Sequence, residues 1–166
     1  QVIVATDDNR IKEVSEDLGI KSFLTSKDIK NGTERILAIL DHIDSEFIIN
    51  LQGDEPLVNP NDLNNLYREI KSSDADVVSI CHEVNNLESE KPSNVKVVFD
   101  KNNYALYFSR NEIPYNSDFL HIHAGIYGFT RFALEKIKSL ETSSLEKLEN
   151  LEQLRWIENG LNIKML

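Results

Sequence analysis

The segment with the clearest chemical potential is Leu-Gln-Gly-Asp-Glu-Pro at residues 51–56, which follows an apolar run at residues 47–51. Such a run is typical of a strand buried on both faces of a sheet, and ligands of open α/β sheets collect beyond the carboxyl ends of strands. Gly53 allows a tight turn that presents Asp54 at this edge. A carboxylate there suits Mg²⁺, which takes one or two carboxylates plus substrate phosphates. The motif fits equally well a plain strand–turn in which Asp54 is only a cap.

A second candidate is the segment Lys-Asn-Gly-Thr-Glu-Arg at residues 30–35, where a polar loop enters a predicted helix. A helix N-terminus offers unpaired N–H groups and a positive dipole end to a phosphate or a nucleobase. Lys30 and Arg35 add positive charge to it. The simpler interpretation is an ordinary helix capped by Thr33. The chain has neither Gly-x-Gly-x-x-Gly nor a P-loop motif, so a dinucleotide fold and a P-loop fold are poorly supported.

Three further groups lie in the second half of the chain. Arg110 ends a predicted strand, where it can grip a carboxylate through two hydrogen bonds or lie on the surface. Strand alternation puts His121, His123, Gly125 and Tyr127 on one face. Two histidines at this spacing can bind a metal, but no cysteine or third histidine lies near, so hydrogen bonding to a polyol is favoured. Taken by itself, the segment Leu-Glu-Gln-Leu-Arg at 151–155 indicates a solvated stripe of polar side chains on a long helix.

The elements that must position these residues follow from periodicity and end signals. Strands are predicted at residues 1–5, 20–24, 47–51 and 76–82, alternating with helices at 7–18, 33–43 and 61–72, which is the pattern of a parallel sheet with covering helices. The second half changes character, with a hairpin from strands 95–99 and 104–109, a strand at 121–129 and a helix at 130–140. Ser143 and Glu146 form a capping box for a longer helix that ends before Gly160.

Composition excludes several classes of protein. The chain has 166 residues, 40% of them hydrophobic and 28% charged, and a formal net charge of −10. This suits one folded domain and neither a disordered nor a membrane-spanning chain. The acidic surface disfavours sequence-independent binding to nucleic acids or anionic membranes. The single cysteine, Cys81, cannot form an internal disulfide, and no Ser/His/Asp or Cys/His nucleophile set is recognisable.

Taken in order, these segments resemble the 3-deoxy-manno-octulosonate (KDO) cytidylyltransferases, also called CMP-KDO synthetases. The resemblance spans nearly the whole chain. Its motifs are 4–7 (Val-Ala-Thr-Asp), 31–35 (Asn-Gly-Thr-Glu-Arg), 51–56, 94–98 (Asn-Val-Lys-Val-Val), 104–110 (Tyr-Ala-Leu-Tyr-Phe-Ser-Arg), 123–128 (His-Ala-Gly-Ile-Tyr-Gly) and 151–155.

The resemblance implies an α/β fold, a Rossmann-like nucleotidyltransferase three-layer sandwich whose mixed, mostly parallel sheet carries an antiparallel hairpin excursion. It implies one cytidylyltransferase-like domain over residues 1–166 and transfer of the cytidylyl group of CTP to KDO. The products are CMP-KDO, used in lipopolysaccharide biosynthesis, and pyrophosphate. It also implies Mg²⁺ dependence, a homodimer with subunit contact near the hairpin, a cytoplasmic location, and neither nucleic acid nor membrane as partner.

Carried over residue by residue, the resemblance makes Asp54 the magnesium ligand and, with Gln52, the catalytic pair. Gln52 then contacts the sugar or the nucleotide. The remaining roles follow the same motifs: the nucleotide is bound by Lys30, Asn31, Gly32, Thr33 and Arg35, and the sugar acid by Arg110, His123, Tyr127, Glu152 and Gln153. Arg110 binds the carboxylate of the sugar acid, and the other sugar-binding residues bind its hydroxyl groups.

Asn31 stands where the family usually has serine. The family's N-terminal nucleotide loop and C-terminal metal-ligand segment have no counterpart among these residues, so we expect a partial domain that is inactive by itself. Two alternatives stay open. The chain is a sibling cytidylyltransferase for another acid sugar, 8-amino-KDO or a nonulosonic acid, or it is a truncated, non-catalytic domain that dimerises.

Overall fold

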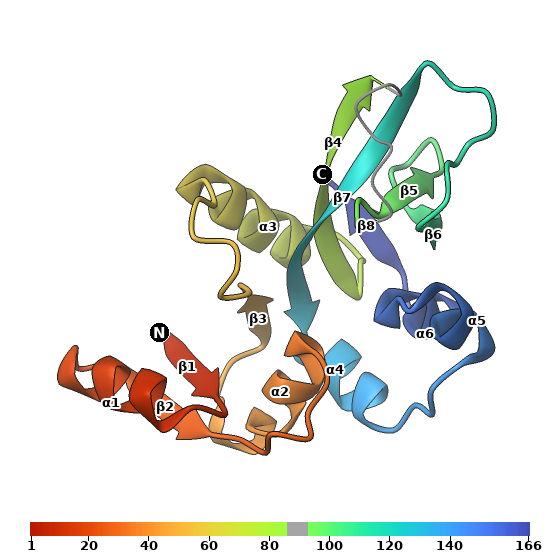
Figure 1. Cartoon of the computed structure of the whole chain (residues 1–166). Coiled ribbons are helices and arrows are strands. Elements are labelled where there is room, and N and C mark those ends of the chain that lie inside the picture. Colours follow the sequence, from red (N-terminus) through yellow and green to blue (C-terminus); the bar gives the residue numbers. More distant parts are fainter. Residues whose placement is uncertain (86–92) are drawn as a thin grey trace. The chain divides into compact units, whose positions relative to one another are not determined.

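The computed structural model describes residues 1–85 and 93–166. The described chain forms two compact units, Gln1–Ser45 and Glu46–Leu166 (Figure 1). We call them unit 1 and unit 2 and consider each by itself. None of the described helices has the length and the apolar character that a membrane crossing demands.

Unit 1 begins with a parallel strand pair joined by a helix. Strand β1 (Ile3–Thr6) pairs with β2 (Lys21–Leu24), and α1 (Asn9–Asp17) connects them. The side chain of Asp8 accepts a hydrogen bond from the backbone N–H of Arg10 and so caps α1. Gly19, with φ of +73°, reverses the chain after the helix, in a conformation that glycine adopts without steric cost. The predicted strand–helix–strand order is therefore confirmed in this unit.

The second helix of unit 1, α2, is shorter than predicted and has a different cap. It spans Gly32–Leu37 and is followed by a 3₁₀ turn, η1 (Leu40–His42). Its N-cap is Asn31, whose side-chain oxygen accepts from Glu34 N at 2.8 Å. Thr33 already lies inside the helix and is fully buried, so the prediction that Thr33 is the cap was wrong. An asparagine at the N-cap bonds the third helical N–H directly, and the cap therefore lies two residues before Thr33.

Unit 2 is built on a six-stranded mixed sheet. Its strands are β3 (Phe47–Asn50), β4 (Val77–Asn85), β5 (Lys96–Phe99), β6 (Ala105–Ser109), β7 (Phe119–Thr130) and β8 (Ile163–Met165). The order is β6-β5-β7-β4-β8, with β3 also paired to β7. The predicted hairpin is confirmed as the antiparallel pair β5 and β6.

The direction of the strands explains why this sheet is mixed. Strand β7 runs antiparallel to β3, β4 and β5, whereas β4 and β8 are parallel. Strands β3, β4, β5 and β8 therefore point one way, and β6 and β7 point the other way. The sheet is mixed, as expected, but most of its neighbouring pairs are antiparallel rather than parallel, because β7 lies between the strands that share a direction.

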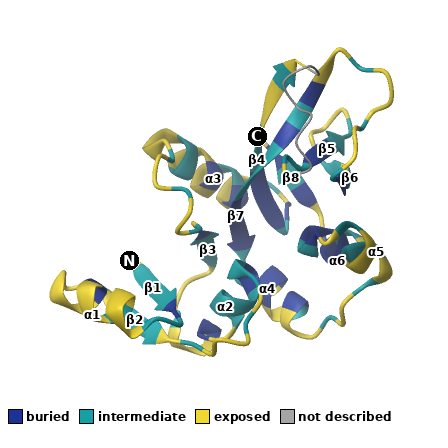
Figure 2. Ribbon diagram, in the orientation of Figure 1, coloured by how far each residue is buried: buried dark blue, intermediate teal, exposed yellow. Residues whose placement is uncertain are grey.

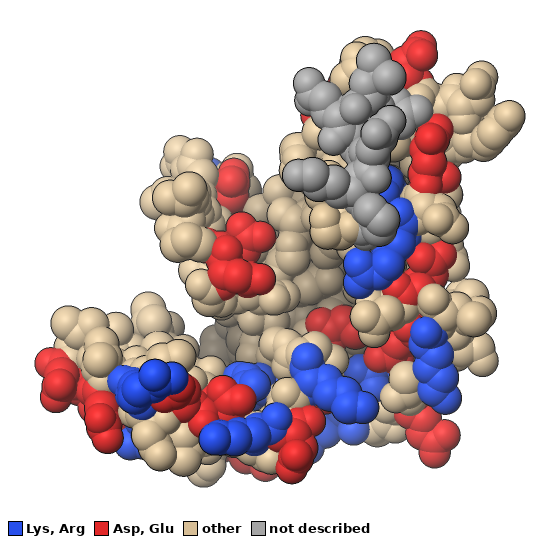
Figure 3. Space-filling view, viewed as in Figure 1, with Lys and Arg blue, Asp and Glu red and all other residues tan. Residues whose placement is uncertain are grey.

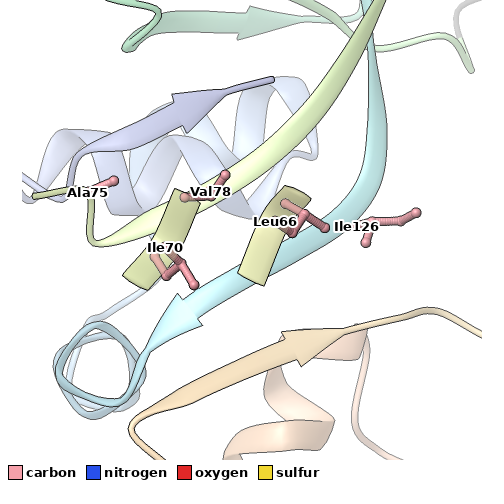
Figure 4. Packing of buried hydrophobic residues seen from close by; sticks show 5 residues of the cluster. All are labelled: Leu66, Ile70, Ala75, Val78 and Ile126. Atoms are coloured by element: carbon pink, nitrogen blue, oxygen red, sulfur yellow. The ribbon is translucent and has the colours of Figure 1, made fainter. Parts of the chain in front are cut away.

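Helices cover both faces of this sheet, and strand alternation shows how. On one face, α3 (Pro60–Ser72) places Leu66 and Ile70 against Val78 of β4 and Ile126 of β7 (Figure 4). The next residue of β7, Tyr127, points to the opposite face, because successive side chains of a strand alternate. These layers carry the buried core (Figure 2).

On that opposite face, the rings of Tyr127 and Trp156 lie 5.2 Å apart. Trp156 belongs to α6 (Glu152–Glu158). The three-layer arrangement expected from the sequence is confirmed.

The long helix predicted after Ser143 is two helices. After α4 (Arg131–Lys138), the capping box of Ser143 and Glu146 starts α5 (Ser144–Glu149) as predicted. Asn150 then adopts a left-handed conformation, with φ of +54°, which ends α5. Leu151 becomes the N-cap of α6, so Glu152 is the first residue of a helix rather than part of a helix interior.

Candidate functional site

The predicted nucleotide group lies in unit 1, around the start of α2. Lys30 is exposed, whereas Asn31 and Gly32 are half-buried. The Arg35 guanidinium donates to Thr25 Oγ1 at 2.5 Å, and its Nη2 lies 3.6 Å from a carboxylate oxygen of Asp7. Arg35 thus ties α2 to the residues that follow β1 and β2, so it has a structural function beside its predicted role in nucleotide binding. On the face shown in Figure 3, Lys and Arg are interleaved with Asp and Glu.

In unit 2, Gln52 and Asp54 occupy the loop that follows β3. The N–H of Glu55 donates to the carbonyl of Gln52 at 3.1 Å, which closes the expected turn. Asp54 is exposed and Gln52 is half-buried. Gly53 has no left-handed φ, and a Cβ there would meet open space. The sequence indicated that this turn needs glycine, but the structure shows that it does not.

A bulge in β7 lies beside Gln52. Ser79 of β4 is opposite Tyr127, but the next residue, Ile80, is opposite Ala124, so the register of the two strands shifts here. The backbone carbonyls of the bulge accept hydrogen bonds from side chains. Gln52 Nε2 donates to the carbonyl of Gly125 at 3.0 Å. A Cβ at residue 125 would lie 3.3 Å from that nitrogen, so glycine lets the amide approach. Bulges often redirect side chains next to active sites.

Two aromatic side chains of β7 stand beside this bulge as neutral hydrogen-bonding groups. The His123 imidazole lies 5.2 Å from the Tyr127 ring and 5.1 Å from the Phe108 ring. Burial lowers the pKa of His123 to about 3. Burial, and then the negative charge of Glu152, raises the pKa of Tyr127 well above its usual value. Uncharged His and Tyr suit hydroxyl ligands, and no cluster of three His, Cys, Asp or Glu residues for a metal occurs in the described part of the chain.

Arg110 is held at the junction of α5 and α6. Its Nε donates to the carbonyl of Glu149 at 2.8 Å and its Nη2 to the carbonyl of Asn150 at 3.1 Å. The Glu149 carboxylate accepts in turn from Arg110 N at 2.9 Å and from Ser109 Oγ at 2.9 Å. Since Glu152 follows this junction, β6 and α6 bring Arg110 and the Glu152–Gln153 pair to one region. Gln153 is 3% exposed, so the interpretation as a solvated stripe was wrong for it.

Three residues of this region were missed by sequence reasoning: Ser79, Lys96 and Glu149. Lys96 is 3% exposed, and its ammonium donates to the carbonyls of Asn94 and Arg110, each at 2.8 Å. Burial lowers the pKa of Lys96, and the charge of Arg110 acts in the same direction. A lysine between valines of a predicted strand was the available signal. Nothing in the sequence pattern distinguishes Ser79 or Glu149.

The structure therefore gathers Gln52, His123 and Tyr127 around the β7 bulge and fixes Arg110 beside α6. A cytidylyltransferase family model matches residues 1–163. The chain belongs to the cytidylyltransferase family.

Similar proteins agree with this assignment. The cytidylyltransferase is 45% identical to a 3-deoxy-manno-octulosonate cytidylyltransferase of Fusobacterium nucleatum, over 99% of this chain and 70% of that protein. It is 40% identical to an 8-amino-3,8-dideoxy-manno-octulosonate cytidylyltransferase of Shewanella baltica, over 99% of this chain and 71% of the relative. A solved CMP:2-keto-3-deoxy-manno-octonic acid synthetase complexed with CTP superposes with a TM-score of 0.94 at 36% identity, over 100% of this chain and 71% of that one.

Acid is expected to destabilise this cytidylyltransferase through His123. The folded pKa, about 3, lies below the ordinary value of 6.5, so folding favours the neutral imidazole. Its stabilising contribution is fully present above pH 6.5 and is lost as the pH falls toward 3. Between pH 7 and pH 5 the linked loss is about 1–2 kcal/mol, allowing for partial exposure.

Urea unfolding at the two pH values measures this loss. The parent should lose more unfolding free energy than His123→Gln does. His82→Gln, which changes an exposed imidazole, should behave like the parent. An equal loss in parent and His123→Gln would contradict the assignment to His123.

Proposed function

We propose that this chain belongs to an enzyme that transfers the cytidylyl group of CTP to KDO, which gives CMP-KDO and pyrophosphate. The observation that carries the proposal is the match of the whole chain, with a TM-score of 0.94, to a synthetase complexed with CTP. Relatives named for this reaction, 38–45% identical over 99% of the chain, support it.

In the proposed reaction, the anomeric hydroxyl oxygen of KDO attacks the α-phosphorus of CTP in line. The bond between the α-phosphorus and the bridging oxygen breaks, pyrophosphate leaves, and the hydroxyl proton passes to solvent. No covalent enzyme intermediate is needed, so catalysis consists of positioning and charge stabilisation. This agrees with the state of Cys81, because burial raises the pKa of its thiol to about 11 and keeps it unreactive.

The sugar acid is proposed to bind along β7 and the end of β6. Neutral His123 and Tyr127 exchange hydrogen bonds with its hydroxyl groups, and Gln52 orients the reacting oxygen beside the bulge. Arg110 supplies positive charge for the carboxylate of the sugar acid, and the Lys96 ammonium donates a hydrogen bond to the Arg110 carbonyl. Glu152 and Gln153 complete the hydroxyl contacts. Lys30, Asn31, Gly32, Thr33 and Arg35 are proposed to bind the nucleotide.

Magnesium is the proposed cofactor, with Asp54 as its protein ligand. The donor set fits, because an exposed carboxylate at a loop offers Mg²⁺ one oxygen and leaves its other positions to water and phosphate. When bound, the ion would neutralise phosphate charge as a Lewis acid.

A homodimer is a further proposal. Strand β6 lies at the edge of the described sheet, and Leu106 on this strand is 59% exposed. An exposed edge strand with an apolar side chain favours pairing or covering. A cytoplasmic location and a place in lipopolysaccharide biosynthesis complete the proposal and stay predictions.

A second substrate, 8-amino-KDO, is favoured by the Shewanella baltica relatives, which match almost as well as those named for KDO. The two sugars differ in a single group, a hydroxyl in one and an amine in the other. A choice between them therefore depends on a local contact rather than on the fold.

The full-length gene product is expected to release pyrophosphate only when CTP, KDO and Mg²⁺ are all present. A coupled pyrophosphate assay with one component omitted at a time measures this requirement. UTP and ATP serve as nucleotide controls, and 8-amino-KDO and a nonulosonic acid as sugar controls. Much faster turnover of another sugar would show that this sugar, and not KDO, is the substrate. Equal use of UTP or ATP would overturn the assignment of CTP as the nucleotide.

A further inference from the structure

Ser79 lies at the centre of the β7 bulge. Its side chain is fully buried, and its hydroxyl oxygen meets three polar atoms. The carbonyl oxygen of Ile126 is 2.7 Å away, the carbonyl oxygen of Ala124 is 3.3 Å away, and Nε2 of His123 is 2.8 Å away. Gly125 and Ile126 have no register partner in β4, because the pairing jumps from Ser79–Tyr127 to Ile80–Ala124. The Ser79 hydroxyl is therefore hydrogen-bonded both to the backbone of the bulge and to the His123 imidazole.

The number of protons on Ser79 decides the direction of these bonds. A serine hydroxyl has one proton to donate and two lone pairs, whereas a carbonyl oxygen only accepts. At 2.7 Å the contact with Ile126 requires that proton, since two oxygens without a proton between them would repel. The contact with His123 must then run the other way, with Nε2–H donating to Ser79 Oγ. The second ring nitrogen, Nδ1, consequently carries the lone pair.

We propose that Ser79 is a positioning residue that fixes His123 in the Nε2–H tautomer, so that His123 Nδ1 acts only as a hydrogen-bond acceptor. The rings of Phe108 and Tyr127 lie within 5.2 Å of the imidazole and hold its plane. Burial also lowers the pKa of His123 and keeps the imidazole neutral, so a second N–H does not form near neutral pH. Ser79 is not a nucleophile, because its proton is committed to a backbone carbonyl.

The consequence for substrate rests on the proposed function. A sugar hydroxyl beside His123 must donate its proton to Nδ1, which sets the direction of hydrogen bonding along the polyol. The tautomer acts through the geometry of His123, so Ser79 need not touch the substrate.

The test is a long-range ¹H–¹⁵N correlation spectrum of the chain labelled with ¹⁵N-histidine at neutral pH. His123 is assigned by the signals that His123→Gln removes, and His42, His82 and His121 serve as internal references. We expect a single tautomer for His123, with a pyrrole-type Nε2, a pyridine-type Nδ1 and an Nε2 proton that exchanges slowly with water. An Nδ1–H tautomer, averaged shifts or a rapidly exchanging proton in the parent would each overturn the proposal, whether or not any variant folds.

Variants then test the role of Ser79 itself. Ser79→Ala should give averaged His123 nitrogen shifts, and Ser79→Thr, which keeps the hydroxyl, should restore the parental pattern. Ser73→Ala removes a hydroxyl that donates to the carbonyl of Glu69 at 2.8 Å and accepts from Ala75 N at 3.4 Å, and should leave His123 unchanged. Unaltered His123 signals in Ser79→Ala would show that Ser79 does not set the tautomer.

Kinetics of the full-length protein separate this inference from the proposed function. Ser79→Ala should raise KM for the sugar acid about tenfold, the loss of roughly one hydrogen bond, while KM for CTP stays the same. If no sugar acid is turned over, the function proposal fails, but the spectra still decide the tautomer. If KM for the sugar is unchanged although the tautomer shifts, then His123 Nδ1 does not accept a hydrogen bond from the substrate.

Discussion

The full-length cytidylyltransferase that carries Asp54→Asn is expected to release pyrophosphate at least about 100-fold more slowly than the parent, with no change in stability. Asp54 is exposed in the loop after β3, so an amide of the same shape fits without repacking. The variant loses a negative charge that would hold Mg²⁺ against the triphosphate. Charge stabilisation by a metal lowers the activation barrier by several kcal/mol, and each 1.36 kcal/mol changes the rate by a factor of ten.

The measurement is turnover as a function of Mg²⁺ concentration, together with urea unfolding of both proteins. The variant should need more Mg²⁺ and stay slower at saturation. Asp44→Asn, which changes an exposed carboxylate of unit 1, is the matched control and should keep parental turnover. Parental turnover of Asp54→Asn at the same Mg²⁺ dependence would exclude Asp54 as a ligand.

Leu66→Ala is expected to cost about 2–5 kcal/mol of unfolding free energy. Leu66 is fully buried, and it packs with Ile70, Val78 and Ile126 between α3 and the sheet. Truncation removes apolar area from this cluster and leaves a cavity that the strands on one side and the helix on the other cannot close. Because Ile126 belongs to the bulge, the loss is felt at the backbone that supports the candidate sugar site.

Urea unfolding followed by far-ultraviolet circular dichroism measures this loss. Leu148→Ala is the matched control, since it makes the same chemical change at a side chain that is 81% exposed on α5. The control should change stability by less than about 0.5 kcal/mol. A loss below about 1 kcal/mol in Leu66→Ala would show that the cluster does not carry the packing described.

The sequence by itself determined the elements whose signals are local. The apolar run at 47–51 predicted β3, and the turn between 99 and 104 predicted the β5–β6 hairpin. The capping box at Ser143 predicted the start of α5. These predictions held because periodicity, capping and turn chemistry act over a few neighbouring residues. The succession of motifs also led to the cytidylyltransferase family, which the family model confirms.

Only the tertiary structure decided the features that depend on partners distant in sequence. The helix break at Asn150 coincides with the docking of Arg110 on the carbonyls of Glu149 and Asn150, some forty residues apart in the chain. The β7 bulge depends on the pairing with β4, and its carbonyls accept hydrogen bonds from Ser79 of β4 and from Gln52 in the loop after β3.

Local propensity carries no information about such contacts, because a hydroxyl or an amide that bonds a remote carbonyl looks like any surface residue in the sequence. The sequence thus determined which residues are chemically able to act. The sheet decided that His123 is neutral, that Gln153 is buried and that Arg110 is held in place, because burial and hydrogen-bond partners exist only once β6, β7 and α6 have packed.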